Sequence, residues 1–339
     1  MRLVRRIVIL TTLVSALGAA GCIRKSATLP QALAVQDQIP LDQLVDRINS
    51  YQNLRTTSAQ ITVTVTDLLA SYRYSEANGA LRLKRPESIR LKISAPAPFA
   101  NADIADMASD GARFSLAVFR PRDKAVFVHG SNKLGRMRAD QIKDASDPRL
   151  KDAGALANIR PQHITDAFII RPIAIGGNNE YFREEDRETE PDIRPNKKGH
   201  FVIRTYYVLY VLERGSSGLL HLRRKFWFDR TQTGTPLVRQ QTFEDGDGKI
   251  GSDVVYSDFF YPANSEWPWA QAINIRRPMD GYEMLVRLAS KDSIEINAEL
   301  PSTTFVLENT EHLKELDVDQ PSNATVTSSN QAPGQPGRR

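Results

Sequence analysis

The sequence predicts a mainly β protein: one large, curved antiparallel sheet that forms an unclosed β-barrel, or half-barrel, covered by a few helices. About ten segments alternate apolar and polar residues with a period of two, which is typical of strands that bury only one face. Turn residues separate many consecutive segments, so hairpins are expected to join them. Only two segments repeat apolar residues at helical spacing. Many strands with few helices predict a single sheet domain.

Residues 1–21 are predicted to be a signal peptide. Three arginines among the first six residues precede an apolar run over residues 7–17 and a group of small residues, 18–21. A basic head, a short apolar core and small residues before a cleavage point are typical of an export signal. The apolar run is shorter than the roughly twenty residues needed to span a bilayer. Cys22, the only cysteine in the chain, follows directly.

Cys22 and the small residues before it resemble the lipobox of bacterial lipoproteins. The resemblance implies that the Cys22 thiol receives a diacylglycerol, that the signal is cleaved before it, and that the new amino terminus gains an N-acyl chain such as palmitate. It departs from the family at Ala19, where leucine is usual. The alternative is an ordinary secretory signal with an incidental cysteine. Ile23, in place of aspartate, implies a lipid anchor in the outer membrane, facing the periplasm.

Composition limits the partners and the organisation of the chain. Three of the five net positive charges belong to the signal arginines, so the remainder carries only +2, which gives no electrostatic reason to expect nucleic acid as a partner. Residues 22–40 are expected to form a polar, lipidated tether. Residues 41–313 are expected to form the sheet domain, and residues 314–339, rich in Ser, Asn, Gln, Pro and Gly, a disordered tail. A single cysteine excludes an internal disulfide.

Two segments are predicted to be helices. The first covers residues 41–48, and the second begins at Pro161, because proline is preferred in the first helical turn. The second ends before Arg171-Pro172, since the residue before a proline disfavours helical geometry. The apolar stripes are Leu41, Leu44, Val45 and Ile48 on the first helix, and Ile164, Ala167 and Phe168 on the second.

The first half of the domain is predicted to be a series of strands with one apolar face and one basic or hydroxyl face. The expected strands are residues 61–66, 81–84, 89–93, 114–118 and 125–128. Turns are expected at Asn78-Gly79, at Arg85-Pro86-Glu87 and at Ser109-Asp110-Gly111. No element is predicted for residues 134–158, where the periodicity is poor.

The second half is predicted to begin with a loop and to continue as hairpins. Residues 176–199 mix seven acidic with five basic residues and are expected to form a solvated insertion between strands; a partner-binding lid is the alternative. The expected strands are residues 201–212, 219–229, 237–244, 250–261, 273–275, 282–288 and 305–307. Residues 215–218 and 245–248 are predicted to be hairpin turns.

The order of these features resembles a known superfamily. The features are the leading helix, the Ser109-Asp110-Gly111 turn before Phe114, the Arg160-Pro161 helix, the segment from Arg277-Pro278 to Tyr282, Asn297 and the late strand at Phe305. Together they resemble the LolA/LolB-like superfamily of outer-membrane lipoprotein carriers over most of residues 41–307. The charged insertion at residues 176–199 departs from the compact carriers of that superfamily.

The resemblance implies an apolar cavity inside the half-barrel that binds acyl chains of membrane lipids or lipoproteins, as a carrier or an acceptor. The alternative is a structural lipoprotein whose sheet binds an envelope protein complex without carrying lipid. The expected cavity-lining residues are Ile61, Val63, Val65, Leu81, Leu83, Leu91, Ile93, Phe114 and Leu116; plain core is the alternative for each, so the set is informative and no single member is. Phe99, on the proline-stiffened loop 96–100, is the candidate membrane contact; a buried strand connection is the alternative.

No pattern in the sequence predicts an enzyme. The five histidines lack the spacing of a metal site. Residues 215–218 are not a nucleophile elbow, because no strand-to-helix transition surrounds them. Residues 245–248 resemble a calcium loop only at their start, since Lys249, Ile250 and Tyr256 occupy positions that need an oxygen ligand, glycine and glutamate. We therefore expect neither a metal nor a cofactor beyond the acyl groups on Cys22.

Overall fold

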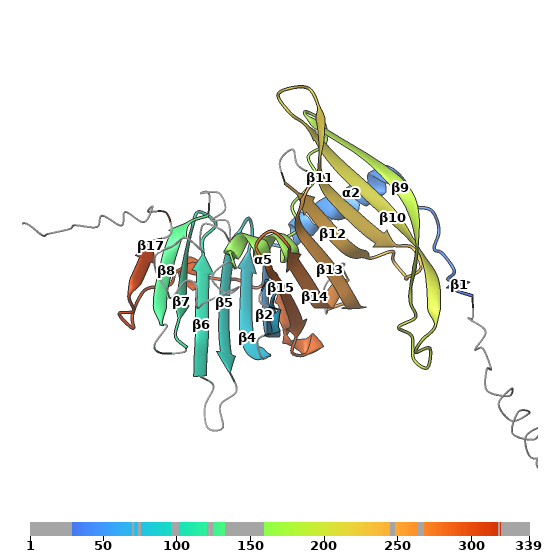
Figure 1. Ribbon diagram of the computed structural model, residues 1–339. Helices are drawn as coiled ribbons and strands as arrows, with labels where there is room; N and C mark the ends of the chain where they lie inside the picture. The colour runs from blue at the N-terminus through green and yellow to red at the C-terminus, as the bar shows by residue number, and fades with distance from the viewer. Residues whose placement is uncertain are drawn as a thin grey trace, which may run out of the picture.

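The fold is known from a computed structural model. It describes residues 29–69, 71–73, 76–95, 102–120, 122, 125–132, 159–244, 248–262, 268–317 and 319. Cys22, the loop that carries Phe99 and all but a few residues of the expected tail lie outside the described residues. The described strands belong to one sheet that runs the length of the molecule, with helix α5 lying across its middle (Figure 1).

Strands β2 to β8 form the amino-terminal half of this sheet. Their bounds are β2 Thr56–Asp67, β3 Tyr72–Arg73, β4 Ala77–Lys84, β5 Ser88–Ala95, β6 Ala102–Ser109, β7 Arg113–Val118 and β8 Val126–Ser131. Except for the two-residue β3, which pairs with the end of β2, each strand pairs antiparallel with the next described strand of the half. The predicted turns at residues 85–87 and 109–111 are confirmed. Asp110 accepts the backbone N–H groups of Ala112 and Arg113, at 2.8 and 2.9 Å, which fixes the second turn.

Strands β9 to β15 form the carboxy-terminal half. Their bounds are β9 Asn179–Pro191, β10 Phe201–Arg214, β11 Leu220–Asp229, β12 Leu237–Phe243, β13 Ile250–Phe260, β14 Trp269–Arg277 and β15 Tyr282–Leu288. Each again pairs antiparallel with the next, so the hairpins predicted at residues 215–218 and 245–248 connect the strands that they were expected to connect. Residues 245–247 themselves lie outside the described residues.

Strand β2 joins the two halves. It pairs with β4 on one side and with β15 and β16 (Ile294–Ile296) on the other. Among the described strands, β9 lies at one edge of the sheet and β17 (Glu315–Asp317) at the other, and the two do not pair. The predicted mainly β, unclosed sheet is therefore confirmed, although the chain does not cross it in a single meander.

Helices α2 (Leu41–Ser50) and α5 (Pro161–Phe168) cover the inner face, where the apolar side chains of the strands gather. The predicted stripe of α2 is buried at Leu44, Val45 and Ile48, each at most 1% exposed. Pro161 occupies the first turn of α5 as expected, because its missing N–H would have no helical partner there. Both predicted helices are confirmed.

The hairpin turn predicted at Asn78-Gly79 is wrong, because both residues lie inside β4. They pair with Thr62 and Ile61 of β2 on one side and with β5 on the other. A Cβ on Gly79 would lie 3.0 Å from the backbone oxygen of Lys92. The glycine therefore permits close packing of neighbouring strands. The sequence pattern identified a position that needs a glycine, but the reason is strand packing and not a turn.

The loop predicted for residues 176–199 is also wrong over most of its length, since residues 179–191 form strand β9. Its charged side chains lie opposite β10, and Arg214 is paired with Glu180. A strand at the sheet edge can expose both faces to water, so it carries no apolar alternation to recognise.

The late strand predicted at residues 305–307 is a short 3₁₀ helix, η5 (Ser302–Phe305), followed by an irregular segment. Its aromatic residue, Phe305, is buried although it is not in a strand. The alternating pattern therefore predicted the burial of Phe305 correctly but predicted the wrong secondary structure for this segment.

The amino-terminal segment expected to be part of a tether is bound to the sheet from residue 31 onward. Strand β1 (Gln31–Ala32) pairs in parallel with β10, and the backbone N–H of Leu33 donates to the carbonyl of Ile203 at 3.0 Å. The N–H of Gln36 donates to the carbonyl of Arg230 at 2.7 Å. Main-chain hydrogen bonds hold this segment on the sheet. Because such bonds do not depend on the side chains, the polar composition of the segment did not indicate that it would bind there.

Candidate functional site

The α5 cover, defined as residues 161–173, is the apolar segment that lies against the inner face of the sheet. It buries Ile164, Ala167, Phe168, Ile169, Ile170 and Ile173, each at most 6% exposed. Helix α5 contacts β14 of one half and β5 and β6 of the other, so the cover crosses the line where the halves meet. Its position follows from the Pro161 start and from Pro172, which prevents the helix from continuing.

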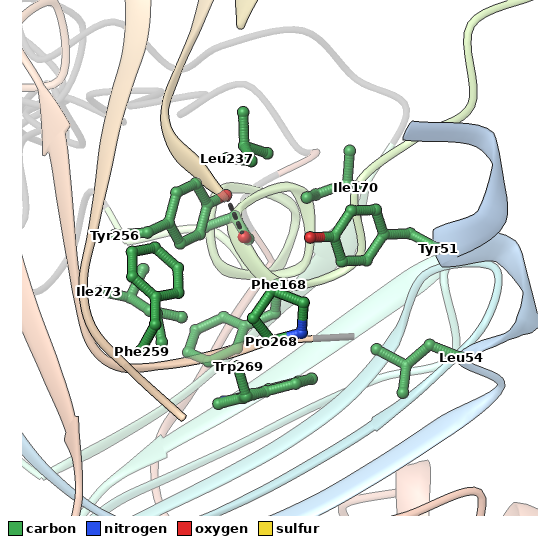
Figure 2. A pocket seen from close by; sticks show the side chains of 12 residues that line it. Tyr51, Leu54, Phe168, Ile170, Leu237, Tyr256, Phe259, Pro268, Trp269 and Ile273 are labelled. Atoms are coloured by element: carbon green, nitrogen blue, oxygen red, sulfur yellow. Dashed lines mark hydrogen bonds between the residues drawn. The ribbon is translucent and has the colours of Figure 1, made fainter. Parts of the chain in front are cut away.

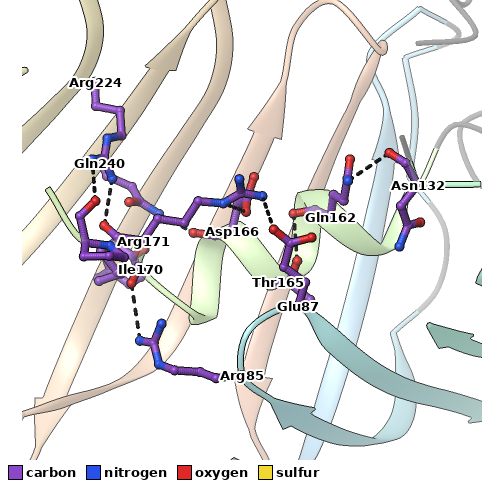
Figure 3. Close-up of polar contacts among 12 residues, drawn as sticks. Arg85, Glu87, Asn132, Gln162, Thr165, Asp166, Ile170, Arg171, Arg224 and Gln240 are labelled. Atoms are coloured by element: carbon purple, nitrogen blue, oxygen red, sulfur yellow. Dashed lines mark hydrogen bonds and ion pairs between the residues drawn. The ribbon is translucent and has the colours of Figure 1, made fainter. Parts of the chain in front are cut away.

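Polar side chains from five other parts of the fold hold the backbone of this cover, and Figure 3 shows Arg85, Arg224 and Gln240 among them. The donors are Gln240 to the Asp166 carbonyl at 2.9 Å, Tyr256 to Ala167 at 2.6 Å, Arg85 to Ile170 at 3.3 Å, Arg224 to Arg171 and Pro172 at 2.7 and 2.8 Å, and Asn49 to Ile173 at 3.1 Å. The last carbonyl groups of a helix have no hydrogen-bond donors within the helix. These side chains supply the missing donors there and along the segment that follows. The cover is thus held by directional bonds as well as by apolar packing.

Burial sets the protonation of these donors. It lowers the pKa of the Arg224 guanidinium to about 10, with Arg171 acting in the same direction, and it lowers the pKa of Arg85. Burial raises the pKa of the Tyr256 hydroxyl well above its usual value. At neutral pH both arginines remain charged and the tyrosine remains protonated, so all three groups can donate.

An apolar hollow lies beside the carboxy-terminal end of α5 (Figure 2). Its lining residues are Tyr51, Leu54, Ala167, Phe168, Ile170, Leu237, Tyr256, Phe259, Pro268, Trp269, Ala270 and Ile273. The volume of the hollow is about 40 Å³, which suits two or three waters. Small-molecule pockets usually measure roughly 300–1,000 Å³, so an acyl chain would fit only after the wall moves.

Few polar groups border the hollow. The Tyr51 and Tyr256 rings approach from opposite sides with their hydroxyl groups toward the α5 cover (Figure 2). Burial raises the pKa of Tyr51 to about 12, with Arg47 acting in the opposite direction. The indole Nε1–H of Trp269 is buried and has no hydrogen-bond partner among the described residues. A buried donor without a partner is uncommon in folded proteins, so the indole N–H of Trp269 remains available to an acceptor.

The nine residues predicted to line a cavity lie in the other half of the sheet or in β2. Ile61, Val63, Val65, Leu81, Leu83, Leu91 and Phe114 are at most 4% exposed, and Ile93 and Leu116 are half-buried against the core. None of the nine lines the hollow at α5. Their burial agrees with the expected inner face, and their contact with a ligand stays a prediction.

The residues that do line the hollow come from η1 (Tyr51–Asn53) and Leu54 after it, the α5 cover, β12, β13, and β14 with Pro268 before it. No local pattern marks them, because they meet only through the pairing of the strands and the crossing of the cover. The one signal available was the aromatic cluster at residues 267–269, to which Trp269 belongs. Among the described residues no cluster of side chains could hold a metal ion.

The fold and the hollow define a class: an unclosed antiparallel sheet with a helical cover over an apolar inner face. No family model matches the sequence, and no curated protein matches it. Among solved structures, the chain is similar to a DUF1329 family protein from Desulfovibrio piger, with 10% identity and a TM-score of 0.44; the match covers 78% of this chain and 95% of the other.

Two further solved structures are similar to this chain. One is described as an outer membrane lipoprotein-sorting protein domain from Vibrio parahaemolyticus, with 7% identity, a TM-score of 0.39 and coverage of 78% of this chain and 94% of the other. The other is a LolA superfamily protein from Nitrosomonas europaea, with 11% identity, a TM-score of 0.39 and coverage of 80% and 99%. One of these solved structures thus belongs to the superfamily that the sequence resembles. The function of this chain has to be argued from its own residues.

Proposed function

We propose that this chain is an envelope lipoprotein, anchored in the outer membrane through acyl groups on Cys22 and facing the periplasm, that binds acyl chains of lipids or lipoproteins as a carrier or an acceptor. The observation that supports this most is the apolar hollow beside a cover whose backbone is held by polar side chains. The binding is non-covalent, and the chain acts on its ligand without catalysis.

The energetics favour a partial opening of the α5 cover. Exposing its five large buried residues to water would cost roughly 8–15 kcal/mol, which equals the whole stability of a typical domain. Moving only Phe168 and Ile170, which border the hollow, costs about 3–6 kcal/mol, within the range of local openings. An acyl chain that takes their place restores the lost apolar contact, so entry and opening are coupled.

Trp269 gives such a ligand a polar contact. Acyl groups in lipids and lipoproteins end in an ester or amide carbonyl. Trp269 lines the hollow, and its Nε1–H has no partner among the described residues. The apolar residues around it then hold the hydrocarbon chain. One donor in an apolar site orients the chain without adding specificity for a headgroup.

The test uses the mature chain with Cys22→Ser and a fluorescent polyene fatty acid that palmitate displaces. Ala167→Leu fills the hollow and is expected to weaken binding at least tenfold. Ala59→Leu is the matched control, because it adds the same bulk to the core away from the hollow and is expected to leave binding within about twofold. Loss of palmitate labelling of the full-length chain with Cys22→Ser tests the anchor.

Equal binding by the Ala167→Leu and Ala59→Leu variants would place the fatty acid elsewhere and contradict the proposed site. No binding by the parent chain, together with no lipid in native mass spectra of the protein, would reject acyl-chain binding. A lipoprotein whose filled core acts as a scaffold for an envelope protein complex would then be the better interpretation.

A further inference from the structure

The basic tip, defined as residues 192–200 between β9 and β10 together with Phe201 at the start of β10, lies beside the point where the amino-terminal segment joins the sheet. Gln31 and Ala32 of β1 pair with Val202 and Ile203, the residues that directly follow the tip (Figure 1). Segments far apart in the sequence therefore meet at one end of the molecule. The other hairpin of β10, at residues 215–218, lies at the opposite end of that strand.

The tip exposes both apolar and cationic side chains. Ile193 is 81% exposed and Phe201 is 49% exposed, and Leu29 on the adjacent segment is 86% exposed. Lys197 and Lys198 are exposed too, and their side chains have no bonded partner among the described residues. Large apolar side chains and free lysines together at one tip are typical of a surface that meets a membrane interface.

The carboxylates nearest the tip are already matched by partners. Asp192 accepts two bonds from the Arg194 guanidinium, at 2.8 and 2.7 Å. Glu190 accepts a bond from the Tyr206 hydroxyl and lies 3.4 Å from the Arg204 guanidinium. Asp192 and Arg194 offset each other within the tip, which leaves the tip with the positive charges of Lys197 and Lys198.

The chain between Cys22 and β1 is short. From Cys22 to Gln31 it spans nine residues, which extend at most about 30 Å. This stretch carries two further basic residues, Arg24 and Lys25. An anchor at Cys22 would therefore keep the tip within reach of the bilayer surface, whose charge is felt over about 8–10 Å at physiological ionic strength.

We propose that the basic tip is a membrane-docking site that takes the phosphate groups of anionic phospholipids on Lys197 and Lys198, while Ile193 and Phe201 enter the interface. This inference goes beyond acyl-chain binding and fixes the orientation of the molecule, with the β9–β10 end toward the bilayer. Its test uses a chain without acyl groups, so it stands or falls independently of the anchor and of the hollow.

The experiment measures co-sedimentation of the mature Cys22→Ser chain with vesicles of phosphatidylcholine alone or with 30% phosphatidylglycerol, at low salt. We expect binding to the anionic vesicles only. Lys197→Gln with Lys198→Gln is expected to weaken it roughly thirtyfold, at about fivefold per lysine. Arg55→Gln with Arg82→Gln is the matched control, since both arginines are exposed and lie near the other half of the sheet. That variant removes the same charge and should bind like the parent.

A second measurement reports the contact directly. Because Cys22 is the sole cysteine, Ile193→Cys in the Cys22→Ser chain gives one thiol for an environment-sensitive dye. Anionic vesicles are expected to shift the emission of the dye to shorter wavelength at residue 193 but not at Leu219→Cys, which is 64% exposed at the opposite end of β10. The proposal is overturned if anionic vesicles do not bind, if both charge variants weaken binding equally, or if the dye shifts alike at both positions.

Discussion

Asn49 binds the α5 cover through both of its amide atoms. Its Nδ2 donates to the Ile173 carbonyl at 3.1 Å, and its Oδ1 accepts the Ile173 N–H at 2.7 Å. A side-chain amide can replace a backbone partner in this way because it carries one donor and one acceptor group in the same plane. One residue of α2 thus satisfies both backbone groups of Ile173, which would otherwise be buried without partners.

Asn49→Ala is expected to destabilise the fold by about 1–3 kcal/mol, because it leaves two backbone groups of Ile173 without partners. Urea unfolding followed by circular dichroism measures the change. Asn53→Ala is the control: its side chain is exposed, and its effect should stay within about 0.5 kcal/mol. Equal losses in the two variants would mean that the bonds to Ile173 contribute nothing to stability.

Asp192 makes the stability of the folded protein depend on pH in the acid range. The bonds from Arg194 lower the pKa of its carboxyl group to about 2 in the folded protein, against roughly 3.9 for an unfolded aspartate. A carboxyl group whose pKa is lower in the folded protein stabilises the fold at pH values above its pKa in the unfolded chain. This stabilisation is lost as the pH falls through the pKa of the group in the folded protein. The window for Asp192 is therefore about pH 4 to pH 2.

We expect Asp192→Asn to lower the thermal midpoint at pH 6 and to have a shrinking effect as the pH falls from 4 toward 2. Thermal unfolding of both proteins over that range checks the sign, with Asp37→Asn as a control that removes an exposed carboxylate. A difference between Asp192→Asn and the parent that stays constant down to pH 2 would show that the Arg194 bonds do not set the acid response.

At the scale of elements, the sequence predicted those whose pattern is local. Helix α5 could be placed because Pro161 and Pro172 bound an apolar stripe. Strand β9 could not, because an edge strand exposed on both faces carries no alternation, and its charges look like those of a loop. The turn predicted at Asn78-Gly79 was wrong for a related reason. A glycine favours a turn locally, but here Gly79 allows three strands to pack closely.

The hollow was beyond local reasoning altogether. Trp269, Leu237 and Tyr51 lie far apart in the sequence and share no spacing that would group them. They meet because β2 lies between β4 and β15 and pairs with both, which sets where the second half of the sheet lies under α5. The predicted lining residues, such as Leu81 and Leu91, were chosen from strong alternation, and strong alternation is also what a filled core produces.

For the whole molecule, the central position of β2 makes the two halves depend on each other. Every residue of β2 from Ile61 to Val63 pairs with β4 and with β15 at the same time. The core is continuous across this line, since residues from both halves belong to one buried cluster. A sheet with such a shared strand is expected to unfold as one unit.

Leu91→Ala tests this cooperativity, because Leu91 is 4% exposed in β5 while all three tryptophans lie at residue 227 or later. The cavity is expected to cost about 2–4 kcal/mol. In a single cooperative unit, the urea midpoint from tryptophan fluorescence falls as far as the midpoint from circular dichroism. Leu219→Ala, exposed in the half that contains the tryptophans, should leave both midpoints in place. If Leu91→Ala lowered only the dichroism midpoint, the halves would unfold separately, and opening at α5 could proceed by parting them rather than by moving Phe168 and Ile170.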